Sequence, residues 1–373
     1  MAAVRIPADL LPADGRFGSG PSRIRSAQLD ALRAAGTDVL GTSHRQEPVR
    51  SLVRRVRQGV SRLFDLPEGY EVVLGNGGST AFWDVATGWL VGSRVQHLVH
   101  GEFAAKFAAC TARAPFVAES DEVRAEPGSL GTPYAVPGVD TYAWPHNETS
   151  TGVLAPVRRV AGADPGALVL VDATSAAGGV AVDVSQTDAY YFGPQKAFGS
   201  DGGLWLAVLS PAAIARAEQL ARSDRWVPEF LSLPAAIASS RKDETVNTPA
   251  VTTLLLMAEQ LDWLLGQGGL AWSAARCLQS SGLVYAWAED RPFATPFVSD
   301  PAQRSPVVAT VDLDGVDAAE VARVLRDNGV LDVDPYRKLG RNQLRVGTFP
   351  SVEPDDVRAL LGCVDHVVER LQA

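Results

Sequence analysis

A lone lysine lies in an unusual setting in the stretch "YYFGPQKAFGS". There a run of aromatic residues ends in a Gly-Pro turn, Lys196 follows, and further glycines come after it. Most lysines are solvated surface charges, and that is the alternative here. A lysine that projects from a constrained turn and is partly desolvated loses its proton more easily, and its amine can attack a carbonyl to form a Schiff base.

A carboxylate that could serve the same chemistry lies in "ALVLVDATSAAGG". The apolar run predicts a buried strand that ends at Asp172, so the carboxylate lies at the carboxyl edge of a sheet, where open α/β folds bind ligands. The alternative is a carboxylate that only caps the next turn. The spacing from Asp172 to Lys196 leaves room for one connection and a return strand, so both side chains can reach one pocket.

A glycine-rich turn in "LGNGGSTAFW" lies where a predicted strand passes into a helix. Gly78, Ser79 and Thr80 offer backbone N–H groups and hydroxyls at the positive end of the helix dipole, which suits a phosphate. The pattern is neither G-x-G-x-x-G nor a Walker loop, and such turns also occur without any ligand.

Together the three stretches match the needs of pyridoxal 5′-phosphate. This cofactor needs its phosphate held, its ring nitrogen kept protonated by a carboxylate, and its aldehyde bound by a lysine. We therefore predict a pyridoxal-phosphate site built from the glycine-rich turn, Asp172 and Lys196.

The segments that must position these residues alternate between strands and helices. This order predicts the α/β class, with a largely parallel sheet covered by helices on both faces. A long amphipathic helix begins near residue 250, and the segments after it run strand, helix, strand, helix, as in a small α+β domain. We expect a large domain over residues 1–257, whose N-terminal segment packs on the small one, and a small domain over residues 258–373.

Bulk properties narrow the class of protein. The chain has 373 residues, of which 46% are hydrophobic and 21% charged, as in an ordinary soluble globular protein. Its formal net charge of −9 argues against a nucleic-acid partner, so an anionic substrate needs a local basic pocket. Charges interrupt the longest apolar runs, and the N-terminus lacks the apolar stretch of a secretory signal. We predict a cytoplasmic protein with no membrane segment.

The cysteines and histidines do not suggest a metal site. Cys110, Cys277 and Cys363 are far apart and lack metal-ligand spacing, and the five histidines are scattered. We expect buried, unpaired thiols in a reducing compartment.

Nine motifs resemble those of the phosphoserine aminotransferase family, in order and in approximate spacing over nearly the whole chain. They are "GSGPSRI", "TSHRQ", "GNGGSTAFW", "HGEFAAK", "WPHNETSTG", "VDATSAAGG", "FGPQKAFGSDGG", "VNTPAV" and "LRVGTFPSV". This version is similar to the actinobacterial branch. The resemblance implies a class V aminotransferase of fold type I, with a mostly parallel seven-stranded sheet. It also implies a homodimer with sites at the subunit interface.

The resemblance further implies the reaction. The amino group of L-glutamate passes to 3-phosphohydroxypyruvate, which gives 2-oxoglutarate and O-phospho-L-serine. The pathway implied is serine biosynthesis, with pyridoxine biosynthesis left open as a second one.

Cofactor contacts follow from the resemblance, position by position. Lys196 would hold the cofactor and Asp172 its ring nitrogen. Phe103 falls where many relatives have a tryptophan stacked on the ring, and its alternative is core packing. The remaining contacts implied are Gly78, Ser79 and Gln195 to the phosphate, Thr149 to the phenolic oxygen, and Asn247 and Thr248 to the phosphate of the other subunit's cofactor. For the last two, the alternative is capping of the helix that follows.

Substrate contacts are implied in the same way. Arg345 would clamp the α-carboxylate in a bidentate manner, and His44 and Arg45 would contact the substrate. Tyr336 and Arg337 lie where many relatives have histidine and arginine. Because tyrosine does not become cationic near neutral pH, the phosphate pocket would carry less positive charge than in those relatives.

Three rival functions stay open. A class V aminotransferase with another keto-acid preference would share the cofactor residues. A cysteine desulfurase-like enzyme needs a mobile nucleophilic cysteine, whereas Cys277 and Cys363 fall in helical, packed segments. A non-catalytic binding protein on the same scaffold would have lost Lys196.

Overall fold

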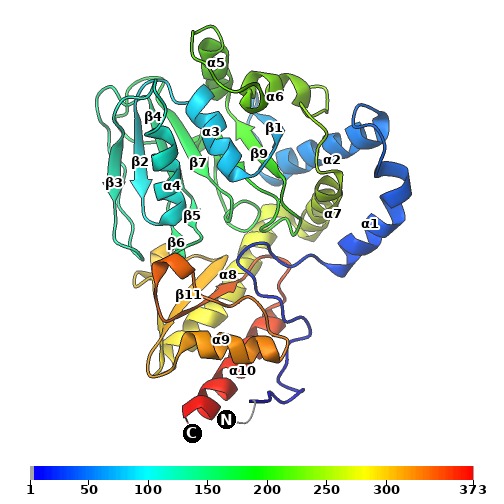
Figure 1. Cartoon of the computed structure of the whole chain (residues 1–373), viewed down its shortest axis with the longest axis vertical. Coiled ribbons are helices and arrows are strands. Elements are labelled where there is room, and N and C mark those ends of the chain that lie inside the picture. The colour runs from blue at the N-terminus through cyan, green and yellow to red at the C-terminus, as the bar shows by residue number, and fades with distance from the viewer. Residues whose placement is uncertain (1–3, 373) are drawn as a thin grey trace.

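A seven-stranded sheet forms the centre of the larger unit of the protein (Figure 1). The computed structural model describes residues 4–372. The strand order is β1-β9-β8-β7-β4-β2-β3; β9 is antiparallel to both of its neighbours, and the other neighbouring pairs are parallel. The strands are β1 (Glu71–Asn76), β2 (Val95–Val99), β3 (Asp121–Arg124), β4 (Thr141–Pro145), β7 (Leu168–Asp172), β8 (Ala189–Phe192) and β9 (Leu204–Leu209). The predicted α/β class with a mostly parallel sheet is confirmed.

Helices cover both faces of this sheet, so its central strands are buried along their whole length. The helices on one face are α1 (Ser26–Val39), α2 (Glu47–Leu63) and α7 (Val251–Gln267). Those on the other are α3 (Ser79–Trp89), α4 (Glu102–Thr111), α5 (Pro211–Leu220) and α6 (Leu233–Ser240). Successive strand residues alternate between the two cores: Tyr190 packs with the first set and Tyr191 with the second.

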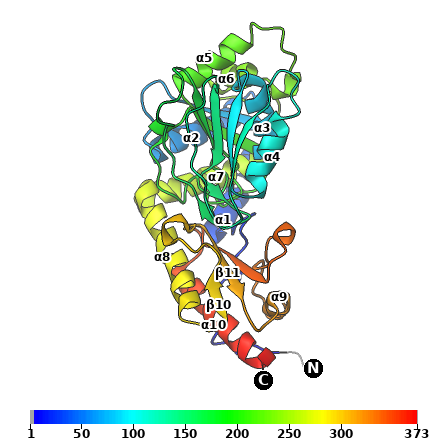
Figure 2. The ribbon, with the colours of Figure 1, turned by 90° about the vertical axis from the view of Figure 1, so that its left-hand side faces the viewer.

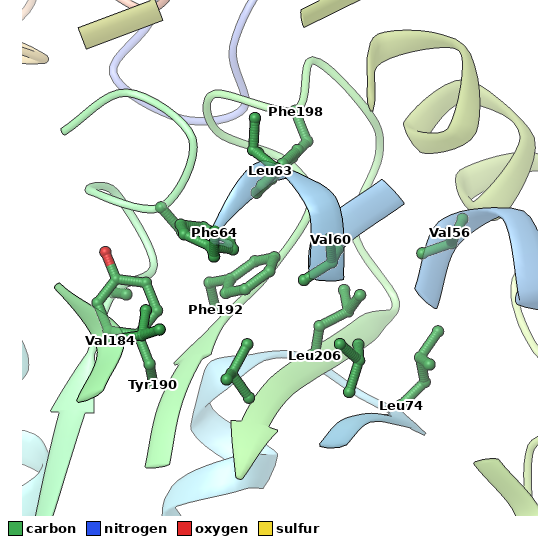
Figure 3. Packing of buried hydrophobic residues seen from close by; sticks show 14 of the residues in the cluster. Val56, Val60, Leu63, Phe64, Leu74, Val184, Tyr190, Phe192, Phe198 and Leu206 are labelled. Carbon is green, nitrogen blue, oxygen red and sulfur yellow. The ribbon is translucent and has the colours of Figure 1, made fainter. Parts of the chain in front are cut away.

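The packing of α2 shows how the pattern of apolar residues fixes a helix on the sheet. Val56, Val60 and Leu63 recur every three or four residues and point at the sheet, where they meet Leu74 and Leu206 (Figure 3). Arginines occupy much of the opposite side of the helix. α2 is therefore an amphipathic helix with its apolar face on the sheet.

A smaller unit lies next to the larger one (Figure 2). It contains a three-stranded antiparallel sheet and its own hydrophobic core. Ile6 and Phe17 from the N-terminal segment lie in this core. The order β11, α9, β12, α10 is the one expected from the sequence, and β10 and α8 precede it. The bounds are β10 (Ala294–Pro296), β11 (Val308–Leu313), β12 (Gln343–Gly347), α8 (Gly269–Glu289), α9 (Ala318–Asp327) and α10 (Pro354–Gln372). The proposed boundary after residue 257 falls inside α7, and the division into domains stays a prediction.

The strands β1, β2, β4, β7 and β8 run the same way, so the loops that follow them meet at one edge of the sheet. The smaller unit lies beyond this edge (Figure 1). A short hairpin of β5 (Asn147–Glu148) and β6 (Val153–Leu154) follows β4 there. No helix within residues 4–372 is long and apolar enough to cross a membrane.

Candidate active site

A cavity of about 190 Å³ lies at this edge of the sheet. Its wall brings together seven of the nine residues predicted to hold the cofactor. They are Gly78, Ser79, Phe103, Thr149, Asp172, Gln195 and Lys196. The wall is completed by Thr80, Trp83, Pro145, Asn147 and Thr174.

Lys196 lies in this cavity and is not a free surface charge. It follows β8 and the Gly-Pro turn, and its Nζ donates a hydrogen bond of 2.6 Å to the backbone oxygen of Ser19. Burial lowers the pKa of Lys196 to about 7; the positive charge of Arg345 adds to this, while Asp172 opposes it. An amine with such a pKa is half neutral near pH 7 and can act as a nucleophile or a base.

Asp172 is the last residue of β7 and is only 7% exposed. Its Oδ2 accepts a hydrogen bond from the Trp83 indole N–H at 3.0 Å, and its Oδ1 accepts from the Thr174 backbone N–H at 3.0 Å and from the Thr174 hydroxyl. Burial raises the pKa of Asp172, whereas these hydrogen bonds and the charge of Lys196 lower it. Asp172 does cap the next turn, through its hydrogen bonds with Thr174, as the alternative interpretation expected. Its carboxylate nevertheless also faces the cavity.

The glycine-rich turn precedes α3, and the start of this helix lines the cavity. Gly77 has a φ of +106°, and Ser79 is the first residue of the helix. A Cβ on Gly78 would meet no described atom within 4 Å, so the space in front of the helix start is open. The Ser79 and Thr174 hydroxyls lie 2.6 Å apart, and because the one Thr174 hydroxyl hydrogen goes to Asp172 Oδ1, Ser79 is the donor of this hydrogen bond. This arrangement fits a phosphate, since free backbone N–H groups point out of a helix N-terminus.

Beside the cavity, the β5 hairpin contacts β12 of the smaller unit. The Thr149 hydroxyl donates to the Ser175 hydroxyl at 2.9 Å, and Arg345 Nη1 donates to the Thr149 backbone oxygen at 3.2 Å. Within residues 4–372, three buried polar atoms near the cavity lack a hydrogen-bond partner: Asn147 Oδ1, Gln195 Oε1 and Arg345 Nε. Buried polar atoms are normally satisfied, so these atoms fit a site that takes a polar ligand.

Phe103 follows the start of α4 and lines the cavity while packing on the sheet core. Its ring centroid lies 6.0 Å from that of Tyr336, and the Tyr336 ring lies 5.4 Å from the guanidinium carbon of Arg345. Tyr336 therefore lies beside both Phe103 and Arg345. Arg337 is exposed and, with Arg345, lines a separate cleft of about 570 Å³ beyond the segment Gly18–Pro21.

Like Tyr336, Arg337 and Arg345, four more predicted residues lie outside the wall of the 190 Å³ cavity: His44, Arg45, Asn247 and Thr248. The Thr248 hydroxyl lies 3.2 Å from His44 Nδ1, and Arg45 pairs with Glu244 at 3.3 Å. The helix-capping alternative for Asn247 and Thr248 is wrong, because α7 has Ala250 as its N-cap and no side-chain cap. Since Arg45, Asn247 and Thr248 are exposed on this chain, their roles stay predictions.

The cysteines lie away from the cavity. Cys277 and Cys363 are buried in α8 and α10, as expected, and all three thiols are free. The expectation of a buried Cys110 is wrong: it is partly exposed on α4, beside a cleft, and its thiol donates to Asp84 at 3.0 Å. The wall of the 190 Å³ cavity, as far as residues 4–372 form it, contains no cysteine, which disfavours the desulfurase alternative. Within the same residues no cluster of metal-binding side chains occurs.

Trp83, Thr174 and Asn147 were not among the predicted site residues. Trp83 comes four residues after Ser79, so both lie on one face of α3, and that spacing is a signal the sequence contains. Thr174 follows Asp172 by two residues, the spacing of a turn closed by an aspartate side chain. Asn147 carries no such signal, because only the folding of the β5 hairpin brings it to the cavity.

Known proteins resemble this chain in fold and in sequence. The structure resembles the crystal structure of a phosphoserine aminotransferase from Cytophaga hutchinsonii, with a TM-score of 0.87 at 21% identity, over 94% of this chain and 99% of that one. The fold is that of the pyridoxal-phosphate-dependent aminotransferases of fold type I. The model of the family "Aminotransferase class-V" matches residues 17–331. The chain belongs to the class V aminotransferase family.

Two curated relatives are similar over almost their whole length. A protein of Mycolicibacterium vanbaalenii is 63% identical over 99% of both chains. A Nocardioides protein named phosphoserine aminotransferase is 58% identical, again over 99% of both chains.

Proposed function

We propose that this protein is a pyridoxal-phosphate-dependent phosphoserine aminotransferase, which transfers the amino group of L-glutamate to 3-phosphohydroxypyruvate and forms O-phospho-L-serine and 2-oxoglutarate. The observation that carries the proposal is the convergence of Lys196 Nζ, the Asp172 carboxylate and the open start of α3 on one cavity. The 58% identity to a relative named phosphoserine aminotransferase supports the substrate assignment.

The residues present fit the cofactor. The backbone N–H groups at the start of α3 and the Ser79 hydroxyl would hold its phosphate, and Asp172 would hold its ring nitrogen. Thr149 would reach its phenolic oxygen, and the Phe103 ring would face its ring. When bound, pyridoxal phosphate supplies an aldehyde that reacts with amines and a protonated ring that withdraws electrons from the substrate's α-carbon.

Lys196 would perform the proton transfers. Because its pKa is lowered to about 7, its Nζ is available as a neutral base near neutral pH. It would take the proton from the α-carbon of glutamate and, in the second half of the reaction, return a proton to the α-carbon of the new amino acid. Two successive half-reactions in one site predict ping-pong kinetics.

Arg345 would orient both substrates by their α-carboxylates. Its Nη1 is held by the Thr149 backbone oxygen, and its buried Nε has no partner within residues 4–372. The phosphate of 3-phosphohydroxypyruvate would be met by Arg337 and by His44 and Arg45. Tyr336 adds no cation to this pocket, because a phenol does not become cationic near neutral pH.

We further propose a homodimer in which Asn247 and Thr248 complete the partner's site, and a cytoplasmic role in serine biosynthesis. Two observations within residues 4–372 support the shared site of the homodimer. Asn247 and Thr248 are exposed on this chain, and neither caps α7.

The decisive experiment combines spectroscopy with Lys196→Ala. We expect the purified wild-type protein to show a visible absorption band with pyridoxal phosphate, and borohydride to fix the cofactor on Lys196, as read by peptide mass. Lys196→Ala is expected to fold, to retain the cofactor non-covalently and to lose transamination by several orders of magnitude. Near-normal turnover in this variant would disprove the mechanism.

Substrate identity needs a direct assay. Glutamate with 3-phosphohydroxypyruvate is compared with glutamate and unphosphorylated keto acids at equal concentration. A higher kcat/KM for an unphosphorylated keto acid would favour the rival aminotransferase.

A further inference from the structure

Trp83 makes a contact that the proposed mechanism does not use. It lies on α3, is buried, and donates its indole N–H to Asp172 Oδ2 at 3.0 Å. The indole stacks on Phe107 of α4, with 6.1 Å between ring centroids and an interplanar angle of 16°. The N–H is thus aimed at Asp172 by two helices that pack on the same face of the sheet.

The two carboxylate oxygens of Asp172 accept hydrogen bonds from different residues. Within residues 4–372, Oδ1 accepts both hydrogen bonds of Thr174, and Oδ2 accepts only the one from Trp83.

Three other titratable groups lie near this carboxylate, and within residues 4–372 none of them donates a hydrogen bond of ordinary geometry to it. The Tyr190 hydroxyl pairs with His146 Nδ1 at 3.0 Å, and Lys196 Nζ donates to Ser19. The Tyr191 hydroxyl is buried close to both Trp83 and Asp172, whose proximity affects the pKa of Tyr191, but within residues 4–372 it makes no hydrogen bond of ordinary geometry. Within residues 4–372, Trp83 is therefore the side chain whose hydrogen bond to Oδ2 is already formed.

We propose that Trp83 is a positioning residue whose indole N–H keeps Asp172 ionised, so that the proton between Asp172 and the cofactor's ring nitrogen stays on the nitrogen. A hydrogen bond donated to a carboxylate stabilises its charged form, and this effect is larger in a buried site. Burial works in the opposite direction, since it raises the pKa of Asp172. The inference rests on the proposed function and deepens it, because it names the residue that sets the protonation of the site.

The test uses the holoenzyme of Trp83→Phe and pyridoxal phosphate labelled with ¹⁵N in its ring. In the wild type the ¹⁵N chemical shift should be that of a protonated ring nitrogen. In Trp83→Phe we expect it to move toward the unprotonated value, because the preference of the proton for the nitrogen falls roughly ten- to a hundredfold on loss of one hydrogen bond to a charge. kcat should fall, while KM for glutamate changes little.

Trp144→Phe is the matched control. Trp144 is also buried, on β4, and its indole N–H has no hydrogen-bond partner within residues 4–372. Both substitutions remove an indole and leave a smaller ring, but only Trp83→Phe removes a hydrogen bond to Asp172. The ¹⁵N shift of Trp144→Phe should equal that of the wild type.

If Trp83→Phe does not fold, β-(3-benzothienyl)alanine at position 83 keeps the bicyclic shape and replaces only the N–H. A wild-type ¹⁵N shift in either folded variant overturns the inference and leaves the proposed function intact. A wild-type protein that binds no pyridoxal phosphate overturns both.

Discussion

Lys196 and Ser19 are joined by a hydrogen bond of 2.6 Å from the side-chain amine to the backbone oxygen. Ser19 belongs to a segment tied to the smaller unit, because the backbone N–H of Gly347 at the end of β12 donates to the Phe17 oxygen at 2.8 Å. The same segment is tied to the lysine loop, since the Ser22 backbone N–H donates to the Gln195 oxygen at 2.9 Å. The position of the lysine amine is thereby linked to the strand that carries Arg345.

Gly20→Ala should displace the lysine amine. A Cβ on Gly20 would lie 1.7 Å from Lys196 Nζ, far inside contact distance. We expect the covalent attachment of pyridoxal phosphate to become about a hundredfold slower, which is the scale of a 1 Å misplacement at a reacting atom. The visible absorption band of the attached cofactor measures this rate. Gly41→Ala is the control: Gly41 also has a positive φ, of +78°, but its Cβ would meet nothing within 4 Å. Equal rates in the two variants would show that the close approach at Gly20 is unimportant.

The rate of cofactor attachment should depend on pH with a midpoint near 7. Burial and the charge of Arg345 lower the pKa of Lys196 to about 7, and only the neutral amine attacks an aldehyde. The rate should therefore rise with pH below this value and level off above it, whereas an ordinary lysine would continue to gain up to about pH 10. Arg345→Gln should move the midpoint to higher pH, because it removes a positive charge that disfavours the ammonium form. A wild-type rate that still climbs steeply above pH 9 contradicts the lowered pKa.

Arg345→Ala should weaken both substrates, because each carries an α-carboxylate. We expect kcat/KM for glutamate and for 3-phosphohydroxypyruvate to fall roughly ten- to a hundredfold or more, the scale of charge-assisted hydrogen bonds. Arg337→Ala and Arg45→Ala should instead penalise 3-phosphohydroxypyruvate more than an unphosphorylated keto acid. Steady-state kinetics with both acceptors separates the two classes, and equal losses on both acceptors would argue against a phosphate pocket at Arg337 or Arg45.

Mixing inactive chains tests whether sites are shared between subunits. Lys196→Ala chains are co-expressed with chains that carry Asn247→Ala and Thr248→Ala, after each homodimer has been shown to be nearly inactive. If Asn247 and Thr248 act in the partner's site, one site of each heterodimer is wholly wild-type. Random pairing then restores about a quarter of wild-type activity in an isologous dimer. Activity no higher than that of the parents would place both residues in the site of their own chain or outside any site.

Much of the cofactor cavity could be predicted from sequence because parallel strands order it. Asp172 and Lys196 each come just after an apolar run, and strands that run the same way deliver the residues after them to one edge of the sheet. The glycine-rich turn before α3 was recognisable for the same local reason. Each of these patterns spans only a few neighbouring residues, so it can be recognised without knowing how distant segments pack.

The hydrogen bonds that tune the site depend on contacts between distant segments. Trp83 and Asp172 come from different elements, and only the packing of α3 on the sheet brings the indole N–H to the carboxylate. The contact of Lys196 with Ser19 likewise needs the N-terminal segment to cross the lysine loop. The spacing of apolar residues predicts which face of a helix or strand is buried. It does not predict which side chain of another element contacts that face.

By itself the sequence determined the α/β class and the order of elements in the smaller unit. It also determined the amine, the carboxylate and the helix start that meet in the cavity. Each of these depends on local periodicity and on turn residues, which a sequence shows directly. Tertiary structure alone decided that the Tyr336 ring lies beside Phe103 and Arg345, that Cys110 is partly exposed, and that Asn247 and Thr248 do not cap α7. The physical reason is that burial and side-chain partners are properties of packed neighbours far apart in the chain, which residue type and spacing do not encode.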